Sequence, residues 1–319
     1  MTKPAFLITI DTEGDNIWQN HYRISTKNTH FLPRFQALCE RYDLKPVYLT
    51  NYEMALDPAY IEFARNVLSR RAGEIGMHLH PWNSPPLAPL TADDGRYKPY
   101  LIEYPADQAR AKVGHMTKLL EDTFQTKILS HRAGRWAFNE YYAALLLEYG
   151  YQVDCSVTPG INWQFSPGNP HGFGGTDYRD FPTQAYFIDL ENIAKPGASQ
   201  LLEVPMSMQY KYSTLLNILK KGFDRLRGKQ RTPSMHWLRP SGNNLNQMKK
   251  VTESALAHSY DHLQFMLHSS ELMPGGSPIF KTDADIEVLY RNLETLFDWL
   301  RHRTVNMTLG EFYTKSQQK

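Results

Sequence analysis

Carboxylates and imidazoles stand where two apolar runs of this sequence end. The segment FLITIDTEGD carries Asp11, Glu13 and Asp15, and GEIGMHLHPW carries His78 and His80. Side chains alternate between the faces of a strand, so Asp11 and Glu13 are expected on one face, as are His78 and His80 on theirs. Like charges this close are costly unless a cation or a chemical task keeps them there. One carboxylate oxygen and two ring nitrogens form a donor set typical of zinc or a similar divalent metal.

Three further apolar runs also end in ionisable groups. His131 and Arg132 end one run, Asp154 follows the apolar run in GYQVDCS, and His268 follows the apolar run in LQFMLHSSE. In parallel α/β barrels the reactive groups gather at the carboxyl ends of the strands, so these residues are expected to share one site with the two segments above. The alternatives are a solvated strand end for the acids and structural imidazoles that stack on Trp82.

Strand-length apolar runs alternate with helical patterns along the sequence. The predicted strands are Ala5–Ile10, Pro46–Thr50, Glu74–Leu79, Lys127–His131, Tyr151–Cys155, Tyr186–Leu190, Leu201–Pro205, Leu263–His268 and Val305–Thr308. The predicted helices are Leu32–Tyr42, Pro58–Arg70, Ala106–Phe124, Glu140–Glu148, Ser213–Arg225, Asn244–Ala257 and Ala284–Arg301. This alternation predicts an α/β fold with a parallel sheet, and the number of strands favours a closed or nearly closed barrel. We expect a single domain over residues 1–319.

Composition narrows the class of protein. The chain has 319 residues, of which 41% are hydrophobic and 21% charged, which is ordinary for a soluble globular protein. A net charge of +2 argues against a nucleic-acid partner. The N-terminal apolar run is too short for a secretory signal, and no run approaches the ~18 residues of a membrane span. Cys39 and Cys155 look like buried hydrophobes rather than a disulfide, so a reducing, cytoplasmic setting is expected.

Taken together and in order, five motifs resemble those of the NodB-type polysaccharide deacetylases of carbohydrate esterase family four. They are TIDTEG, EIGMHLHPW, HRAGRW, DCSVTP and FMLHSSE. The resemblance covers most of the chain and identifies it as a divergent member, similar to those of surface-polysaccharide and O-antigen biosynthesis. It implies a distorted (β/α)7-8 barrel, a divalent metal, and hydrolysis of N- or O-acetyl groups on sugars.

The resemblance implies Glu13, His78 and His80 as the metal ligands. The family separates its two histidines by three residues, whereas this chain has His-x-His and places Trp82 where the second histidine would fall. Strand alternation lets His80 take over as the ligand. Zinc is the expected metal, with nickel, cobalt or manganese as alternatives.

The same resemblance implies the catalytic groups. Asp11 is the general base, Arg132 orients it and keeps it ionised, and His268 protonates the leaving amine or alkoxide. Asp154 is expected to support His268 or Arg132.

Aromatic and basic residues near these motifs are candidates for sugar contacts. Trp82, Arg135 and Trp136 lie in or beside the loops expected at the site. The flat face of an indole suits the apolar side of a sugar ring, although most tryptophans serve core packing.

A basic amphipathic pattern, LLNILKKGFDRLRGKQR, predicts a helical insertion at about 210–240. A barrel helix with a solvated polar face would account for it. Alternatively, residues 211–231 contact an anionic glycan, a nucleotide-linked sugar or an anionic membrane.

The leading hypothesis is a metal-dependent deacetylase that acts on an N-acetylated sugar of a surface polysaccharide or of its nucleotide- or lipid-linked precursor. Two alternatives stay open. One is another metal-assisted C–N hydrolase, deformylase- or allantoinase-like, on the same scaffold. The other is a non-catalytic glycan-binding or assembly protein that kept the barrel and lost turnover.

Overall fold

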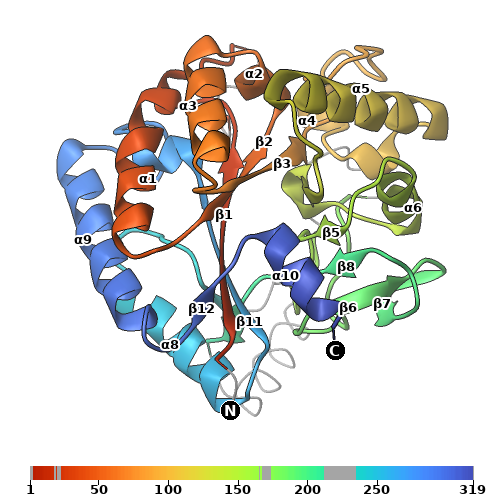
Figure 1. Cartoon of the computed structure of the whole chain (residues 1–319). Helices are drawn as coiled ribbons and strands as arrows, with labels where there is room; N and C mark the ends of the chain where they lie inside the picture. Colours follow the sequence, from red (N-terminus) through yellow and green to blue (C-terminus); the bar gives the residue numbers. More distant parts are fainter. Residues whose placement is uncertain are drawn as a thin grey trace, which may run out of the picture.

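Most of the strands form one curled sheet with helices around its outside (Figure 1). The computed structural model describes residues 3–17, 19, 23–164, 166, 174–211 and 235–318. The helix predicted at Ser213–Arg225 and most of the basic insertion lie outside the described residues. No helix in these ranges is both long and apolar enough to cross a membrane.

A parallel arrangement dominates the sheet. The strands are β1 Ala5–Thr12, β2 Pro46–Thr50, β3 Glu74–Leu79, β4 Ser130–Ala133, β5 Val153–Asp154, β6 Tyr186–Asp189, β7 Asn192–Pro196, β8 Leu202–Glu203, β9 Met208–Tyr210, β10 Met235–Trp237, β11 His262–His268 and β12 Val305–Asn306. Parallel pairing gives the order β11-β1-β2-β3-β4-β5-β8. Strands β6 and β7 extend the sheet antiparallel beyond β8, β12 pairs with the start of β1, and β9 and β10 form a separate hairpin.

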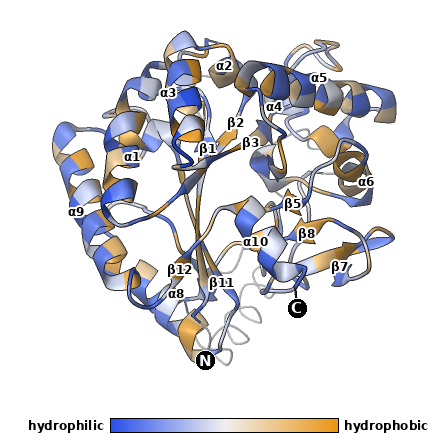
Figure 2. Ribbon diagram, viewed as in Figure 1, coloured by the Kyte–Doolittle hydropathy of each residue, from blue (hydrophilic) through white to orange (hydrophobic). Residues whose placement is uncertain are grey.

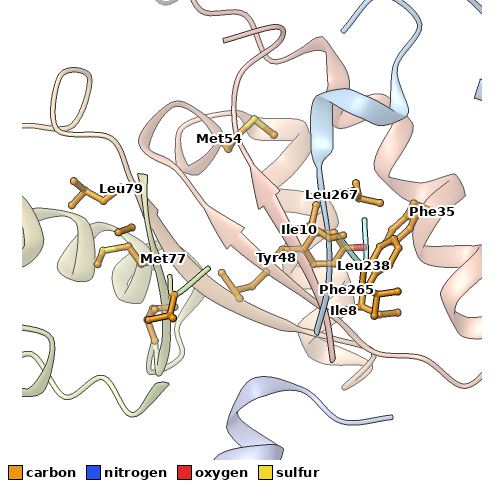
Figure 3. Packing of buried hydrophobic residues seen from close by; sticks show 14 of the residues in the cluster. Ile8, Ile10, Phe35, Tyr48, Met54, Met77, Leu79, Leu238, Phe265 and Leu267 are labelled. Carbon is orange, nitrogen blue, oxygen red and sulfur yellow. The ribbon is translucent and has the colours of Figure 1, made fainter. Parts of the chain in front are cut away.

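Amphipathic helices pack against the outward face of the sheet, whereas α10 packs against inward-facing side chains. The helices are α1 Leu32–Arg41, α2 Tyr52–Ala55, α3 Pro58–Ser69, α4 Asp94–Tyr97, α5 Ala106–Phe124, α6 Glu140–Glu148, α8 Leu245–Ala257, α9 Asp283–Leu300 and α10 Leu309–Ser316. Figure 2 shows hydrophilic and hydrophobic residues mixed along the helices, as expected for elements with one buried face. Ile8 and Ile10 of β1 lie with Tyr48 of β2 and Phe265 of β11 near Phe35 of α1 (Figure 3).

The inward face is apolar towards the N-terminal ends of the strands. Its side chains form a second buried cluster with helix α10, made of Ala5, Leu7, Val47, Leu49, Val153, Cys155, Leu202, Val204, Leu309, Phe312 and Tyr313. The backbone N–H of Gly310 also donates to Glu74 Oε2 at the start of β3, at 2.9 Å. Helix α10 therefore closes this end of the curled sheet and leaves the carboxyl ends of the strands for a site.

Strands β8 and β11 are the two outermost strands of the parallel part of the sheet, and hydrogen bonds link them. The backbone N–H of Gln264 in β11 donates to Ser207 Oγ at 2.9 Å. Leu238 bridges the same gap, since its N–H donates to the Ser207 carbonyl at 3.0 Å and its carbonyl accepts from Met266 at 3.3 Å. These contacts make the sheet a nearly closed barrel, so the predicted distorted (β/α) barrel is confirmed.

The structure differs from the sequence prediction mainly in the second half of the chain. The strands predicted at Pro46–Thr50 and Glu74–Leu79 are confirmed, whereas β4, β5 and β8 are shorter than predicted. Strands β7, β9 and β10 and helices α2, α4 and α10 were not predicted. Strand β7 reads NIAKP and lies at the edge of the sheet, where polar residues and proline are tolerated.

Candidate active site

The predicted chemical residues meet at the carboxyl ends of β11, β1, β3 and β4. Asp11 is the register partner of His268 between β1 and β11. His78 is the register partner of Arg132 between β3 and β4. All four continue the inward-facing alternation of their strands, so the pairing of neighbouring strands brings them together inside the barrel.

Glu13, His78 and His80 form a buried group of potential metal ligands. Glu13 Oε2 lies 2.9 Å from His80 Nε2 and 3.4 Å from His78 Nε2. One ligand atom from each residue lies within 4.8 Å of the other two. A tetrahedral zinc ion with bonds of about 2.0–2.2 Å holds its ligand atoms roughly 3.3–3.5 Å apart. The donor set and its spacing therefore fit a divalent metal.

Neighbouring groups orient two of these ligands. His78 Nδ1 lies 2.9 Å from the carbonyl oxygen of Arg132, which can only accept, so Nε2 is the nitrogen left for a metal. Ser269 Oγ accepts from the backbone N–H of Glu13 and donates to its carbonyl, each at 3.1 Å. Asn28 Nδ2 donates to the same carbonyl at 2.9 Å. The chain after β1 is thus fixed on two sides.

The electrostatics of the group favour a cation. Burial raises the pKa of the Glu13 carboxyl, but hydrogen bonds from His78 and His80 outweigh burial and hold this pKa well below its ordinary value. Burial lowers the pKa of His78, yet Asp11 and Glu13 bring it above its ordinary value. For His80 burial dominates, and its pKa is lowered. An ionised carboxylate between two imidazoles is the charge pattern that a divalent ion would complete.

Packing fixes the ring of His80. Within the ranges that the structure describes, His80 Nδ1 is buried without a hydrogen-bond partner. The ring of Trp82 lies 5.4 Å from the imidazole at an interplanar angle of 36°. A Cβ atom on Gly134 would come within 2.6 Å of His80 Nδ1, so only glycine leaves room there. An indole has no lone pair to offer a metal, and Trp82 thus supports the ligand beside it.

Asp11 is held by a wholly buried arginine. Arg132 Nη1 donates to Asp11 Oδ1 at 2.5 Å, Nη2 donates to Thr9 Oγ1 at 2.7 Å, and Nε donates to the Cys155 carbonyl at 3.1 Å. Burial raises the pKa of Asp11, but Arg132 and then His78 outweigh burial, so this pKa is lowered. The carboxylate is therefore ionised and oriented, as a general base requires.

His268 faces Asp11 and Glu13 from β11. Its Nε2 lies 3.7 Å from Asp11 Oδ2 and 3.9 Å from Glu13 Oε1. Its Nδ1 lies 3.3 Å from Glu271 Oε2, which also accepts from the backbone N–H of His268 at 2.8 Å. Arg239 Nη2 donates to Glu271 Oε1 at 2.8 Å. One side of the imidazole thus faces the candidate metal group while the other is held in place.

Glu271 and Arg239 were not predicted as site residues. Burial raises the pKa of Glu271, but Arg239 and His268 lower it to about 2, so this carboxyl is ionised beside the imidazole. Glu271 lies in the motif FMLHSSE, three residues after His268, and this spacing was a usable signal. Arg239 follows β10, where the sequence carries no motif.

Asp154 does not reach the site. Its neighbour Val153 faces the inside of the barrel, so Asp154 faces the opposite side of the sheet. There its Oδ1 lies 2.6 Å from His131 Nδ1. Burial lowers the pKa of Arg132, whereas Asp11 and, among further groups, Asp154 raise it. Asp154 therefore acts on Arg132 through its charge while its side chain contacts His131, and its predicted supporting role stays a prediction.

Aromatic rings gather beside Arg132. Its guanidinium carbon lies 4.9 Å from the centroid of the Trp136 ring. Trp237 lies 5.8 Å from Trp136 and 6.4 Å from Trp163, measured between ring centroids. These three tryptophans form an aromatic cluster next to the candidate catalytic groups, which keeps Trp136 as a candidate for sugar contact.

The turn after β4 places Arg135 and Trp136 in an unusual backbone conformation. Their φ angles are 54° and 62°, in the left-handed region that costs non-glycine residues of order 1–3 kcal/mol. Arg135 is exposed, and its side chain hydrogen-bonds the buried Tyr100. Such backbone strain is typical of functional sites.

Comparisons with known proteins point to the same fold. No family model and no curated protein matches the sequence. A solved structure assigned as a glycoside hydrolase/deacetylase from Parabacteroides distasonis matches with a TM-score of 0.65 and 11% identity, over 99% of this chain and 72% of that one. A structure assigned as a polysaccharide deacetylase from Mycobacterium smegmatis matches with a TM-score of 0.55 and 13% identity, over 99% and 92%. A 4-alpha-glucanotransferase from Thermococcus litoralis matches with a TM-score of 0.53 and 12% identity, over 99% and 41%.

At this identity the likenesses establish the fold. The chain has the (β/α) barrel of structures assigned as polysaccharide deacetylases, which confirms the resemblance of the sequence motifs at that level. The match to a glucanotransferase shows that related barrels carry other reactions, so the reaction must be argued from the site.

Proposed function

We propose that this protein is a metal-dependent deacetylase that hydrolyses an N-acetyl or O-acetyl group on an amino sugar. The observation that carries the proposal is the meeting of three functions in one buried group. Glu13, His78 and His80 offer ligands for a metal, Asp11 is an ionised carboxylate, and His268 faces both carboxylates.

Proton abstraction is assigned to Asp11. Arg132 keeps the Asp11 carboxylate ionised and aimed at the centre of the site. Glu13, His78 and His80 would hold the ion, which supplies Lewis acidity to a water molecule and to the acyl carbonyl. Zinc suits two imidazoles and a carboxylate, with nickel, cobalt and manganese as alternatives.

Protonation of the leaving group is assigned to His268. When water adds to the acyl carbon, a C–O bond forms and the C–N bond breaks, so the leaving nitrogen needs a proton. His268 Nε2 is on the side of the carboxylates and can donate that proton. Glu271 at Nδ1 keeps the imidazole in this orientation. The products are acetate and an amine, or an alcohol in the case of an ester.

The substrate is a carbohydrate that carries an N-acetyl group. Trp82 and Trp136 offer flat faces at the site, and Arg135 lies beside them. Within this class we favour a nucleotide- or lipid-linked precursor of a surface polysaccharide, which would suit a cytoplasmic enzyme.

The basic segment 211–231 would bring the enzyme to an anionic glycan or membrane. Neutralising Lys220, Lys221, Arg225 and Arg227 should then abolish salt-sensitive binding to anionic liposomes. Liposome binding unchanged by these substitutions, or absent in the wild type, would contradict this part of the proposal.

Acetate release from a panel of N-acetylated sugars tests the proposed reaction. The zinc-loaded protein should release acetate and free amine in equal amounts, and chelation should stop it. Asp11→Asn and His268→Ala should each lower kcat by about 10²–10⁴-fold, because each removes a proton-transfer group. Glu287→Gln, which alters a surface carboxylate paired with Arg34, is the matched control.

Acetate release at the wild-type rate by both variants would refute the proposal. Turnover of formylated or cyclic amide substrates in place of acetylated sugars would favour the other C–N hydrolases. Sugar binding without any turnover would favour the non-catalytic alternative.

A further inference from the structure

A cleft of about 890 Å³ opens next to His268, and nothing above assigns it a function. It lies between β10, the chain that leads into α8, and the loop at 278–279. The residues that matter for its chemistry are Lys211, Trp237, Arg239, Asn243, Gln247 and Glu271.

Two residues connect the cleft to the proposed catalytic site. Arg239 and Glu271 line the cleft, and both contact His268. Arg239 Nη2 lies 3.3 Å from His268 Nδ1, and it donates to Glu271 Oε1 at 2.8 Å. His268 is the residue that would protonate the leaving amine. The cleft is therefore within reach of a substituent on the sugar carbon next to that amine.

The lining combines apolar side chains with cations and amides. Met235, Trp237, Pro278 and Ile279 supply apolar surface. Lys211 and Arg239 are cationic, and Glu271, the one carboxylate among the lining residues that the structure describes, is bonded to Arg239. Asn243 and Gln247 add amide groups that can donate hydrogen bonds. The polar part of this lining suits an anionic oxygen ligand, and the apolar part suits the face of a sugar ring.

The aromatic wall joins this lining to the site. Trp237 lines the cleft and lies 5.8 Å from Trp136, which covers the guanidinium of Arg132. A sugar stacked on this cluster would keep one edge at the catalytic groups and extend its anionic substituent past Trp237 towards Lys211.

We infer that this cleft binds the phosphate of a phosphorylated sugar, so that the substrate is a glycosyl phosphate or diphosphate. The inference rests on the proposed function and adds to it a subsite for the phosphate of the favoured nucleotide- or lipid-linked sugar. Nucleotide-linked and lipid-linked sugars share this chemistry and would share the subsite.

Binding measurements separate this inference from the proposed reaction. The zinc-loaded Asp11→Asn chain, which should not turn substrate over, is titrated with N-acetylglucosamine methyl glycoside and with N-acetylglucosamine 1-phosphate. We expect the phosphate to bind about tenfold more tightly or better, in a salt-sensitive manner. Lys211→Gln should remove most of this preference without changing the affinity for the neutral glycoside.

Lys249→Gln is the matched control, because Lys249 lies over the ring of Trp299 rather than in the cleft. Repeating the titration with chelator shows whether the Lys211 effect persists when the phosphate has no metal to bind. UDP-N-acetylglucosamine and a polyprenyl diphosphate-linked sugar then distinguish the two sources of the phosphate.

Three results would overturn the inference: equal affinity for the two ligands, binding of neither, or an equal loss for both ligands in Lys211→Gln. Acetate release from neutral and phosphorylated sugars at the same kcat/KM would leave the proposed reaction standing and remove the phosphate subsite. Tight binding of phosphorylated sugars without acetate release would support the phosphate subsite and refute the proposed reaction.

Discussion

Asp11 and Glu13 are two residues apart at the end of β1 and face different partners. Asp11 is bonded to the buried guanidinium of Arg132, whereas Glu13 lies against His78 and His80. Both carboxyls have a lowered pKa despite burial, but a fixed cation causes the shift in the first and two imidazoles cause it in the second. The end of β1 therefore supplies two carboxylates, one for proton transfer and one for a metal ion.

Glu271 acts on the reaction through His268. Replacing Glu271 by Gln should lower kcat by about 10–100-fold with little change in KM, because the imidazole loses the ionised group that orients it. Steady-state kinetics measure kcat and KM separately and so distinguish this effect from weaker substrate binding.

Glu271→Asp keeps the charge and provides the control. It should retain more of the wild-type kcat than Glu271→Gln does. Equal kcat losses in the two variants, or a loss that appears in KM and not in kcat, would show that Glu271 has only a structural role.

Glu203 gives the stability of the protein a distinct pH dependence. It is wholly buried beside Asp154, and burial followed by the charge of Asp154 raises its pKa well above the ordinary 4.5. The folded chain therefore keeps a proton that the unfolded chain releases. Stability should fall as pH rises from the ordinary pKa towards the folded-state pKa, at about 1.4 kcal/mol for each pKa unit of difference.

Glu203→Gln should remove this loss. The amide oxygen can still accept from the N–H of Val157, which lies 3.0 Å from Glu203 Oε1. The Tm of the variant relative to wild type should rise with pH above about pH 5, by about 2–4 °C for each kcal/mol of stability that the wild type loses, as measured by thermal unfolding. Glu191→Gln, at an exposed position, should show no such trend. A difference in Tm that is constant or shrinks with pH would contradict the assignment.

The position of a side chain could be predicted from the sequence where the alternation of a strand alone determines which way the side chain points. Asp11, Glu13, His78 and His80 follow apolar runs by the expected spacing, and the structure brings them together. Asp154 does not join them, because its position in β5 is one residue out of phase with the inward face. The contacts of Glu271 with Arg239 depend on how distant segments pack, which no local pattern encodes.

At the scale of elements, helix α10 closes the N-terminal end of the barrel. Phe312 is 1% exposed, and its ring centroid lies 5.8 Å from that of His262. Phe312→Ala should lower the free energy of unfolding by about 3–5 kcal/mol, because it leaves a cavity among apolar side chains. Chemical denaturation measures this loss.

Leu87→Ala is the control for Phe312→Ala, because it truncates an apolar side chain that is 65% exposed and lies outside α10. It should change the free energy of unfolding by no more than about 0.5 kcal/mol. A loss in Phe312→Ala as small as that of the control would mean that α10 is not a part of the core.

The predicted elements were most accurate where the chain is both apolar and central in the sheet. Strands β2 and β3 have the predicted bounds because each is a short apolar run between polar turns. The short strands β9 and β10 form a hairpin whose pairing comes from chain contacts rather than from a hydrophobic pattern. The sequence 309–316 mixes polar and apolar residues over only two turns, so its helical pattern was too short to recognise.

At the scale of the whole molecule, the interior of the barrel changes from apolar to charged along its axis. Apolar side chains and α10 fill one end, whereas Arg132, Asp11 and the candidate metal ligands occupy the other. The fold class could be predicted because parallel strands with terminal ionisable groups are typical of such barrels. The link between β8 and β11 through Ser207 and Leu238 could not be predicted, because these two residues lie outside any apolar run that predicts a strand.

The proposed reaction depends on Glu13, His78 and His80 holding one divalent ion beside Asp11. Anomalous X-ray diffraction at the zinc edge, from crystals of the zinc-loaded protein, locates that ion. We expect a single strong peak bounded by Glu13, His78 Nε2 and His80 Nε2, and no peak there in Glu13→Ala crystals. No zinc between these three side chains in the wild type, or zinc at the same place without Glu13, would refute the metal site.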